Sequence, residues 1–338
     1  MDLTAYRVLG RSGLEVSPLA LGTGRWGGGD RSALRAMYEI YTDAGGNFVD
    51  TADVYGSEEM LGDFLGAGIR DRIILASKCG FASPDGTGGN GGRHIRAALE
   101  GSLKRLRTDH LDLYWIHIWD QVTPVEEVLG TLVDLVKAGK IRHFGLSNVP
   151  AWYVAKMATL AGAHGVPGPV ALQLQYSLAE RGIELEHFDA AEDLGLAIVP
   201  WSPLGGGLLA RRERTDDAAT ASHDYEESGP FGLLKPTARN ALIRKVVLAI
   251  ADESRATPAQ VALAWVVGRQ GVASTLIGAT RAAQMVENVA ALKVVLTPEQ
   301  QERLDVVSTV GRRYPHTLFT PAMRDTVFGG QGAPAGAS

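Results

Sequence analysis

Short apolar runs alternate with longer amphipathic segments along most of the chain. Eight of the runs are typical of strands, and they fall at 18–23, 47–51, 72–78, 111–117, 143–148, 171–176, 196–202 and 274–279. The segments between them repeat apolar residues at helical spacing, for example at 93–106, 124–139 and 258–271. Thr123 is expected to be the N-cap of the second of these helices, with Pro124 in its first turn and Gly139 at its end.

This alternation predicts a parallel sheet covered by helices on both faces, because the strands are nearly all apolar. Eight units predict a closed (β/α)₈ TIM barrel, and an open doubly wound sheet is the alternative. Residues 6–17 alternate in polarity around a turn, which predicts a β-hairpin that closes the bottom of the barrel. The chain, residues 1–338, is therefore interpreted as a single barrel domain.

Three segments are longer than the usual connections of such a barrel, namely 79–92, 203–237 and 311–338. The first two follow the third and the seventh predicted strands. Barrel enzymes keep their active sites at the C-terminal ends of the strands, so these loops are expected to overhang that face. We assign the C-terminal tail to the same face.

The amino-acid composition and net charge limit which kinds of binding partner are expected. The chain has 45% hydrophobic and 21% charged residues and a net charge of −5, which is typical of an ordinary globular protein. It offers no basic face, so nucleic acid and anionic membranes are not expected as partners, whereas a small-molecule substrate is. The charged start MDLTAYRVL and the absence of a long apolar run predict a cytoplasmic location.

The single cysteine, Cys79, excludes an internal disulfide framework and a cysteine-based zinc site. We predict no metal. Cys79 follows Lys78 on a predicted strand, so the two side chains should point to opposite faces. A buried structural thiol is the favoured interpretation, with a redox role as the alternative.

Four ionisable residues lie at or just after the C-terminal ends of neighbouring predicted strands. Asp50 ends the second strand, Tyr55 lies five residues later, Lys78 ends the third strand and His117 ends the fourth. Each alone has a structural explanation, as a helix cap, a loop residue, a solvated lysine or a core histidine. Because they converge on one mouth of the barrel, we interpret them together as a catalytic site.

Such a set is suited to proton transfer to a carbonyl oxygen. A tyrosine has a pKa near 10, and an adjacent ammonium lowers that pKa by favouring the anion. Lys78 is expected to supply the ammonium, and Asp50 its counter-ion, because an unpaired buried charge is costly. His117 would orient the carbonyl group or share the proton.

Motifs from residue 7 to residue 292 resemble, in order, those of the aldo-keto reductase family. They read LGRSGLEVSPLALGTG, DTADVYGSEEMLG, ILASKCG, LRTDHLDLYWIHIWD, GKIRHFGLSN, LQLQYS, VPWSPLGGGLL and IGATRAAQMVEN. The resemblance is to bacterial members of the branch that includes the potassium-channel beta subunits. It implies a (β/α)₈ barrel that reduces aldehydes or ketones to alcohols, or the reverse, with NADPH as cofactor and NADH as the alternative. The family's catalytic residues fall on Asp50, Tyr55, Lys78 and His117, with Tyr55 as proton donor to a substrate that receives hydride directly.

The resemblance also implies the cofactor contacts. The nicotinamide carboxamide would bind Ser147, Asn148 and Gln173, whose groups both donate and accept hydrogen bonds, and Trp201 would stack on the ring. The pyrophosphate would lie along Ser202, Pro203, Leu204 and Gly207. The adenosine end would be held by Gly278, Arg281, Gln284, Glu287 and Asn288, for which a solvated helix face is the alternative. Arg281 could bind a 2′-phosphate, which predicts a moderate preference for NADPH.

Trp26, Phe81, Trp119 and the aromatic-containing tail at 314–328 are expected to line an apolar substrate pocket, and packing at the barrel rim is the alternative. The stretches GTGRWG at 22–27 and GTGGNG at 86–91 fit the dinucleotide fingerprint GxGxxG. Neither lies in a tight strand-to-helix turn, so neither is interpreted as a Rossmann motif.

Two other functions are compatible with these residues. A class I aldolase would form a Schiff base on Lys78, although it would leave the GLSN and MVEN segments unexplained. A cofactor-binding regulatory subunit would use the barrel for interaction with a partner, since a fold does not determine a function.

Overall fold

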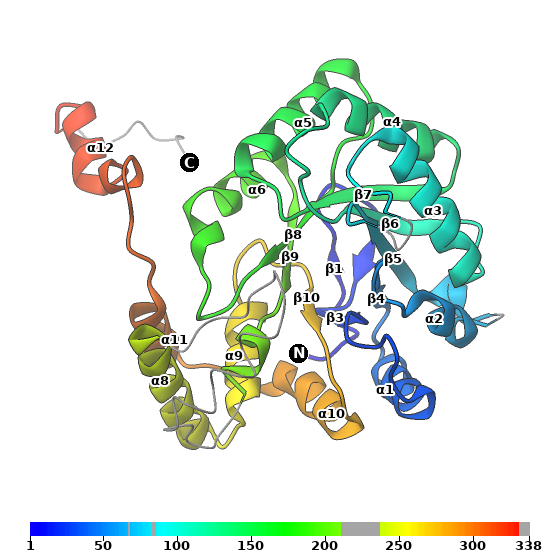
Figure 1. Ribbon diagram of the computed structural model, residues 1–338. Helices are drawn as coiled ribbons and strands as arrows, with labels where there is room; N and C mark the ends of the chain where they lie inside the picture. Colours follow the sequence, from blue (N-terminus) through cyan, green and yellow to red (C-terminus); the bar gives the residue numbers. More distant parts are fainter. Residues whose placement is uncertain (67, 83–85, 211–236, 331–338) are drawn as a thin grey trace. The chain divides into compact units, whose positions relative to one another are not determined.

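The computed structural model describes residues 1–66, 68–82, 86–210 and 237–330. The chain divides into two compact units, Met1–Ser308 and Thr309–Ser338. The first unit contains an eight-stranded parallel sheet surrounded by helices (Figure 1). None of the helices in the described part of the chain has the length and apolar character needed to cross a membrane.

The strands of the sheet follow one another in the order β10-β3-β4-β5-β6-β7-β8-β9. Their bounds are Leu19–Gly22 (β3), Phe48–Asp50 (β4), Ile74–Cys79 (β5), Leu111–Ile116 (β6), Ile141–Ser147 (β7), Ala171–Gln175 (β8), Ala197–Trp201 (β9) and Thr275–Ile277 (β10). The ring closes because the Ile198 amide donates to the Gly271 carbonyl at 2.9 Å and the Ala273 amide donates to the Ile198 carbonyl at 3.0 Å. The predicted (β/α)₈ barrel is confirmed, and the open sheet is excluded.

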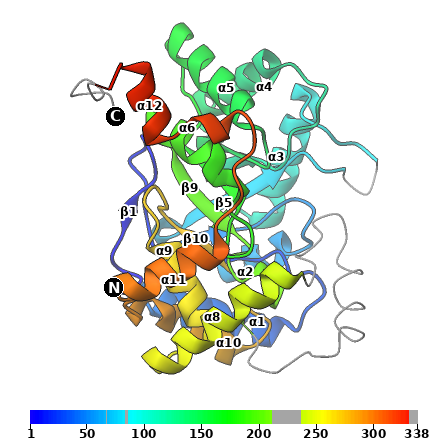
Figure 2. The same ribbon diagram turned by 90° about the vertical axis from the view of Figure 1, so that its left-hand side faces the viewer.

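Amphipathic helices cover the outside of the sheet in the first unit. They are α1 (Arg31–Asp43), α2 (Glu58–Phe64), α3 (Gly92–Leu106), α4 (Val125–Lys137), α5 (Ala151–His164), α6 (His187–Leu194), α8 (Ala238–Ser254), α9 (Pro258–Val267), α10 (Ala282–Ala290) and α11 (Pro298–Ser308). Short 3₁₀ turns are η1 (Arg70–Arg72), η2 (Gly182–Leu185), η3 (Gly205–Gly207) and η4 (Ala291–Lys293). Figures 1 and 2 both show α8, α9 and α11 side by side.

The predicted start of α4 needs a correction. Pro124, not Thr123, occupies the N-cap position, and the helix begins at Val125. The Thr123 hydroxyl donates to Asp120 Oδ2 at 2.6 Å, so this side chain stabilises the preceding loop instead of capping the helix. Gly139 lies one residue beyond the C-cap and has a φ of 71°, a conformation that favours glycine.

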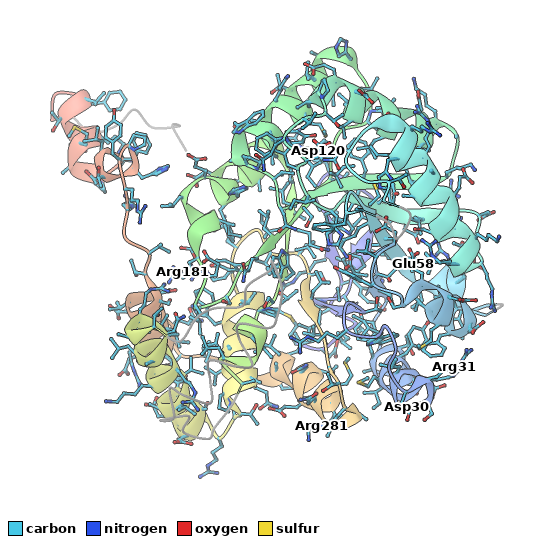
Figure 3. The ribbon with its side chains drawn as sticks, viewed as in Figure 1. Asp30, Arg31, Glu58, Asp120, Arg181 and Arg281 are labelled. Carbon is cyan, nitrogen blue, oxygen red and sulfur yellow. The ribbon has the colours of Figure 1, made fainter. Side chains whose placement is uncertain are left out.

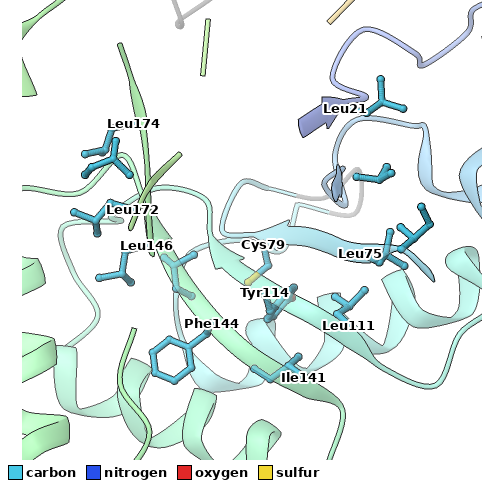
Figure 4. Close-up of a cluster of buried hydrophobic side chains, with 14 of the residues drawn as sticks. Leu21, Leu75, Cys79, Leu111, Tyr114, Ile141, Phe144, Leu146, Leu172 and Leu174 are labelled. Carbon is cyan, nitrogen blue, oxygen red and sulfur yellow. The ribbon is translucent and has the colours of Figure 1, made fainter. Parts of the chain in front are cut away.

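Side chains alternate between the two faces of each strand, as the pleat requires. A large cluster of buried residues packs between the strands and the helices, and Figure 4 labels some of its members, Leu21, Leu75, Cys79, Leu111, Tyr114, Ile141, Phe144, Leu146, Leu172 and Leu174. Cys79 is fully buried there, and burial raises the pKa of its thiol to about 12. This agrees with the predicted structural thiol on the face opposite Lys78.

The bottom of the barrel is closed by the hairpin of β1 (Arg7–Val8) and β2 (Glu15–Val16). Leu9 and Val16 are buried in the same cluster as Phe48 inside the barrel. An added Cβ at Gly10 would lie 2.1 Å from the Val170 carbonyl, immediately before β8. The hairpin therefore packs against the N-terminal ends of the strands, as the sequence predicts.

The long segments differ in what the structure describes. Segment 79–92 is anchored beyond β6, because the Asn90 amide donates to Asp120 Oδ2 at 2.8 Å and Asn90 Nδ2 donates to the Ile118 carbonyl at 2.8 Å. Residues 83–85 of the first segment, 211–236 of segment 203–237 and 331–338 of the tail lie outside the described residues. The tail is not a continuous loop, since the second unit contains η5 (His316–Leu318) and α12 (Pro321–Val327). The assignment of these segments to the active-site face stays a prediction.

Candidate active site

A buried ion pair lies inside the barrel where β4 and β5 end. Asp50 is 1% exposed and Lys78 is 0% exposed. Lys78 Nζ donates to Asp50 Oδ1 and, at 2.8 Å, to the Thr51 carbonyl. Burial alone would lower the pKa of Lys78, but its interactions with Asp50 and with Tyr55 outweigh burial and raise that pKa. Lys78 is therefore an ammonium at neutral pH.

Tyr55 lies beside this pair in the loop after β4. Its hydroxyl is 3.2 Å from His117 Nε2, and Lys78 Nζ is 5.0 Å from the centre of its ring. Burial raises the pKa of Tyr55, the Lys78 ammonium lowers it, and Asp50 raises it. Lys78 thus acts in the expected direction, but burial outweighs it and the net shift of the Tyr55 pKa is upward. Tyr55 therefore keeps its proton at neutral pH, with the expected ammonium next to it.

His117 follows β6 and is buried. Burial and the Lys78 ammonium hold its pKa well below the usual range, so the imidazole is neutral. Within the described residues, Nδ1 has no hydrogen-bond partner. A buried N–H without an acceptor is costly, so we assign the proton to Nε2, which faces the Tyr55 hydroxyl. Nε2–H then donates, and the Tyr55 O–H is left to donate elsewhere.

The second carboxylate oxygen of Asp50 has two donors from other strands. Trp115 Nε1 in β6 donates to Asp50 Oδ2 at 3.0 Å, and Gln173 Nε2 in β8 donates to it at 2.9 Å. Sequence reasoning assigned Gln173 only to the cofactor and missed Trp115. The sequence could have predicted that Trp115 faces the site, because the alternation in LDLYWIH places it on the same strand face as His117.

The residues predicted to hold the nicotinamide lie next to this site. Asn148 Nδ2 donates to the His117 carbonyl and to Ser147 Oγ, both at 2.9 Å, and Trp201 Nε1 donates to Asn148 Oδ1 at 3.1 Å. Gln173 does not bond to these residues directly, but its Nε2 donates to Asp50 of the same site. The set combines a hydroxyl, two amides and an indole ring, which fits a planar group with a carboxamide.

The predicted pyrophosphate segment leaves the end of β9 through an unusual backbone. Ser202 has a φ of 53°, and Gly205, Gly206 and Gly207 have φ values of 57°, 68° and 101°. Ser202 Oγ accepts from the Gly206 amide at 3.1 Å. An added Cβ at Gly207 would have no neighbour within 4 Å, so its backbone is open to a ligand. Pro203 and Leu204 complete this turn.

The predicted adenosine site lies where β10 leads into α10. Arg281 is the N-cap residue of α10 and is exposed (Figure 3). Gln284 Oε1 accepts from the Thr280 amide at 2.9 Å, and Asn288 Nδ2 donates to the Gly278 carbonyl at 3.2 Å. Two of the predicted contacts thus also hold the turn itself. Glu287 lies on the same helix and is partly exposed.

The aromatic residues predicted for the substrate pocket have different surroundings. The ring of Phe81 is 4.6 Å from that of His117 at 81°, so Phe81 borders the site. Trp119 packs edge-to-face on the half-exposed Trp152 at 5.3 Å. Trp26 is 1% exposed and lies 6.2 Å from Phe64 in the core under α1 and α2. Its burial favours the packing role over the substrate pocket.

The fold is a (β/α)₈ barrel, and Asp50, Tyr55, Lys78 and His117 lie close together where its strands end. The chain belongs to the Aldo/keto reductase family, whose model matches residues 18–309. It is 32% identical over 316 residues to norsolorinic acid reductase stcV of Emericella nidulans, covering 87% of this chain and 79% of that protein. It is 35% identical over 311 residues to the uncharacterized oxidoreductase YrpG of Bacillus subtilis, covering 87% and 93%. The protein is therefore an oxidoreductase.

Proposed function

We propose that the protein reduces an aldehyde or ketone to an alcohol, or catalyses the reverse reaction, with NAD(P)H and with Tyr55 as proton donor. The observation that carries this proposal is the position of the Tyr55 hydroxyl, 3.2 Å from neutral His117 and beside the Lys78 ammonium. A small-molecule carbonyl compound as substrate and a cytoplasmic location are part of the same proposal.

The side chains divide the acid–base work between them. A bound nicotinamide would supply the hydride to the carbonyl carbon. Tyr55 donates its proton as the substrate oxygen becomes negative, and the Lys78 ammonium stabilises the phenolate that remains. Asp50 holds the ammonium in place. His117 Nε2–H orients the substrate oxygen as a neutral donor.

The cofactor would occupy the C-terminal ends of β7 to β10. Ser147, Asn148, Gln173 and Trp201 would hold the nicotinamide, Ser202, Pro203, Leu204 and Gly207 the pyrophosphate, and Gly278, Arg281, Gln284, Glu287 and Asn288 the adenosine end. The guanidinium of Arg281 at the start of α10 favours NADPH over NADH, because it can form a forked bond with a 2′-phosphate.

The geometry argues against a Schiff-base aldolase. That reaction needs Lys78 as a neutral amine, whereas Asp50 keeps it protonated. Borohydride treatment with a carbonyl substrate would trap an adduct on Lys78 in an aldolase and none in a reductase. A cofactor-binding regulatory subunit would bind NADPH without multiple turnovers.

The direct test measures NADPH absorbance with the purified protein and a panel of aldehydes, ketosugars and steroid-like ketones. Norsolorinic acid belongs in the panel because one relative is named for its reduction. We expect steady loss of NADPH with at least one carbonyl compound, over many turnovers. NADPH binding without turnover of any compound would favour the regulatory role.

A further inference from the structure

We propose that Trp115 is a positioning residue for the reductase site, whose indole N–H holds Asp50 so that the carboxylate binds Lys78 without drawing the ammonium away from Tyr55. The inference rests on the proposed function and adds a residue to it. Trp115 would act only through Asp50.

The two oxygens of Asp50 have separate tasks. Oδ1 binds Lys78, and Oδ2 accepts from Trp115 Nε1 at 3.0 Å and from Gln173 Nε2 at 2.9 Å. Trp115 is fully buried, so its N–H has no access to water as a substitute acceptor. A buried hydrogen bond to a charged group is directional, and it fixes the rotation of the carboxylate.

The N–H groups of Trp115 and Gln173 also partly neutralise the negative charge of Asp50. Without these hydrogen bonds, Asp50 would attract Lys78 more strongly and would cancel more of the positive potential that the ammonium exerts at Tyr55. Lys78 lowers the pKa of Tyr55 and Asp50 raises it, so the balance between the two sets the proton affinity of the phenol. The other groups that face Tyr55 are Asp53, which raises the same pKa, and neutral His117.

The neighbouring strand β7 leaves space for the indole of Trp115. Trp115 and Gly145 are paired residues of β6 and β7. An added Cβ at Gly145 would lie 2.3 Å from Cζ3 of Trp115 and 2.8 Å from the Ala171 carbonyl. Any larger residue at this position would displace the ring, so the absence of a side chain at Gly145 is what lets the indole reach Asp50.

The test is Trp115→Phe, which keeps an aromatic ring and removes the donor. We expect kcat to fall about tenfold to a hundredfold, the range for loss of one hydrogen bond to a charged group. The KM for NADPH should change little. The basic limb of the pH–kcat profile should move to higher pH, because the pKa of Tyr55 rises.

Tyr114→Phe is the matched control, since Tyr114 is the preceding residue, is equally buried and lies on the outer face of β6. Its hydroxyl donates to the Ile95 carbonyl at 3.3 Å and also interacts with the thiol of Cys79, not with Asp50. This variant should lose stability at most and keep the wild-type basic limb. A shift of equal size in both variants would overturn the assignment, because it would follow from general loosening of the strand.

A second readout does not need turnover. The ultraviolet absorbance of tyrosinate, compared with and without Tyr55→Phe, gives the titration of Tyr55 itself in wild type and in Trp115→Phe. If the phenylalanine variant does not fold, 3-benzothienylalanine at position 115 keeps the bicyclic shape and lacks the N–H. An unchanged titration in the folded variant would overturn the proposal. Failure of the proposed function would appear separately, as a wild-type protein that oxidises no NADPH.

Discussion

At the scale of the residue, Tyr55 is subject to two opposing influences. Burial raises the pKa of its phenol, which keeps the proton in place before the reaction, and the Lys78 ammonium lowers it, which eases release. A phenol that ionised readily would already have lost its proton when the substrate bound. The pair of influences therefore suits a residue that donates only when a negative oxygen forms.

The first prediction concerns the proton donor. Tyr55→Phe should lower kcat by about 10²-fold to 10⁴-fold, the range for loss of a general acid. Fluorescence titration should give a nearly unchanged Kd for NADPH, because the hydroxyl faces His117 and not the residues assigned to the nucleotide. A variant that kept more than about a tenth of the wild-type kcat would show that another group supplies the proton.

A second residue-scale prediction concerns Asp53, two positions before Tyr55. Burial and then Glu58 raise the pKa of its carboxyl from 3.8 to about 7. The folded protein thus binds this proton more tightly than the unfolded chain. The resulting stabilisation is fully present below pH 3.8 and is lost as the pH rises through 7.

Asp53→Asn removes the charge and retains the volume. At pH 8 the variant should be more stable than wild type, by about 1–2 kcal/mol after allowance for solvent screening, and the gain should disappear near pH 4. Urea unfolding at both pH values measures this. Asp43→Asn, at an exposed position at the end of α1, is the reference variant. A gain for Asp53→Asn that did not depend on pH would contradict the assigned protonation.

Sequence reasoning predicted the tetrad because strand ends on a barrel converge regardless of the details of packing. It did not predict the bond from Trp115 to Asp50, because that contact joins β4 and β6 across an intervening strand and depends on the register of all three. It also predicted that Lys78 lowers the pKa of Tyr55, which is correct, but it did not predict that the net shift is upward. Burial decides that direction, and the charges named in a motif do not report burial.

At the scale of the element, the bottom hairpin shows how one residue fixes an orientation. Gly10 has a φ of 57°, and an added Cβ would lie 2.1 Å from the Val170 carbonyl. Alanine there would combine an unfavourable backbone conformation with a clash against main chain that cannot move aside.

Gly10→Ala should therefore lower the free energy of unfolding by about 2 kcal/mol or more. Gly13→Ala is the matched control in the same turn, because an added Cβ at Gly13 meets no atom within 4 Å. Guanidinium unfolding of both variants measures the difference. Equal stabilities would mean that the hairpin does not pack closely against the strand ends.

The elements themselves were largely predictable, since apolar runs and helical spacing are local properties. All eight strands occur within a few residues of the predicted bounds. The start of α4 was misplaced because the Thr123 hydroxyl binds Asp120 in the loop, a tertiary contact that local capping rules do not contain. The helix at Pro321–Val327 was missed because its single turn of apolar residues is too short for a periodic signal.

At the scale of the whole molecule, ring closure brings together distant parts of the proposed cofactor site. The Ser202–Gly207 turn follows β9, and the segment from Gly278 to Asn288 follows β10. These strands are neighbours through Ile198 and Ala273, although seventy residues of chain, 208–277, separate the two segments. A dinucleotide that contacts both segments must span the junction between β9 and β10. Its affinity should therefore depend on closure of the barrel at this junction.

We expect the choice between NADPH and NADH to be decided at one end of this proposed site, at Arg281. Arg281 is exposed at the N-terminus of α10, where the guanidinium and the helix N-terminus both favour a phosphate. Gly278, Ala279 and Thr280 precede it and supply no second cation. One charge-assisted contact contributes about 1.5–3 kcal/mol, so wild type should prefer NADPH by roughly tenfold to a hundredfold in kcat/KM.

Arg281→Ala should remove most of this preference while leaving kcat/KM for NADH nearly unchanged, because NADH lacks the 2′-phosphate. The rise in Tm on adding saturating cofactor should shrink for NADPH only, since stabilisation follows the logarithm of ligand concentration over Kd. Arg93→Ala is the matched control, an exposed arginine in the first turn of α3 after a different strand. Equal use of both cofactors by wild type, or an undiminished NADPH preference in Arg281→Ala, would show that another residue binds the phosphate.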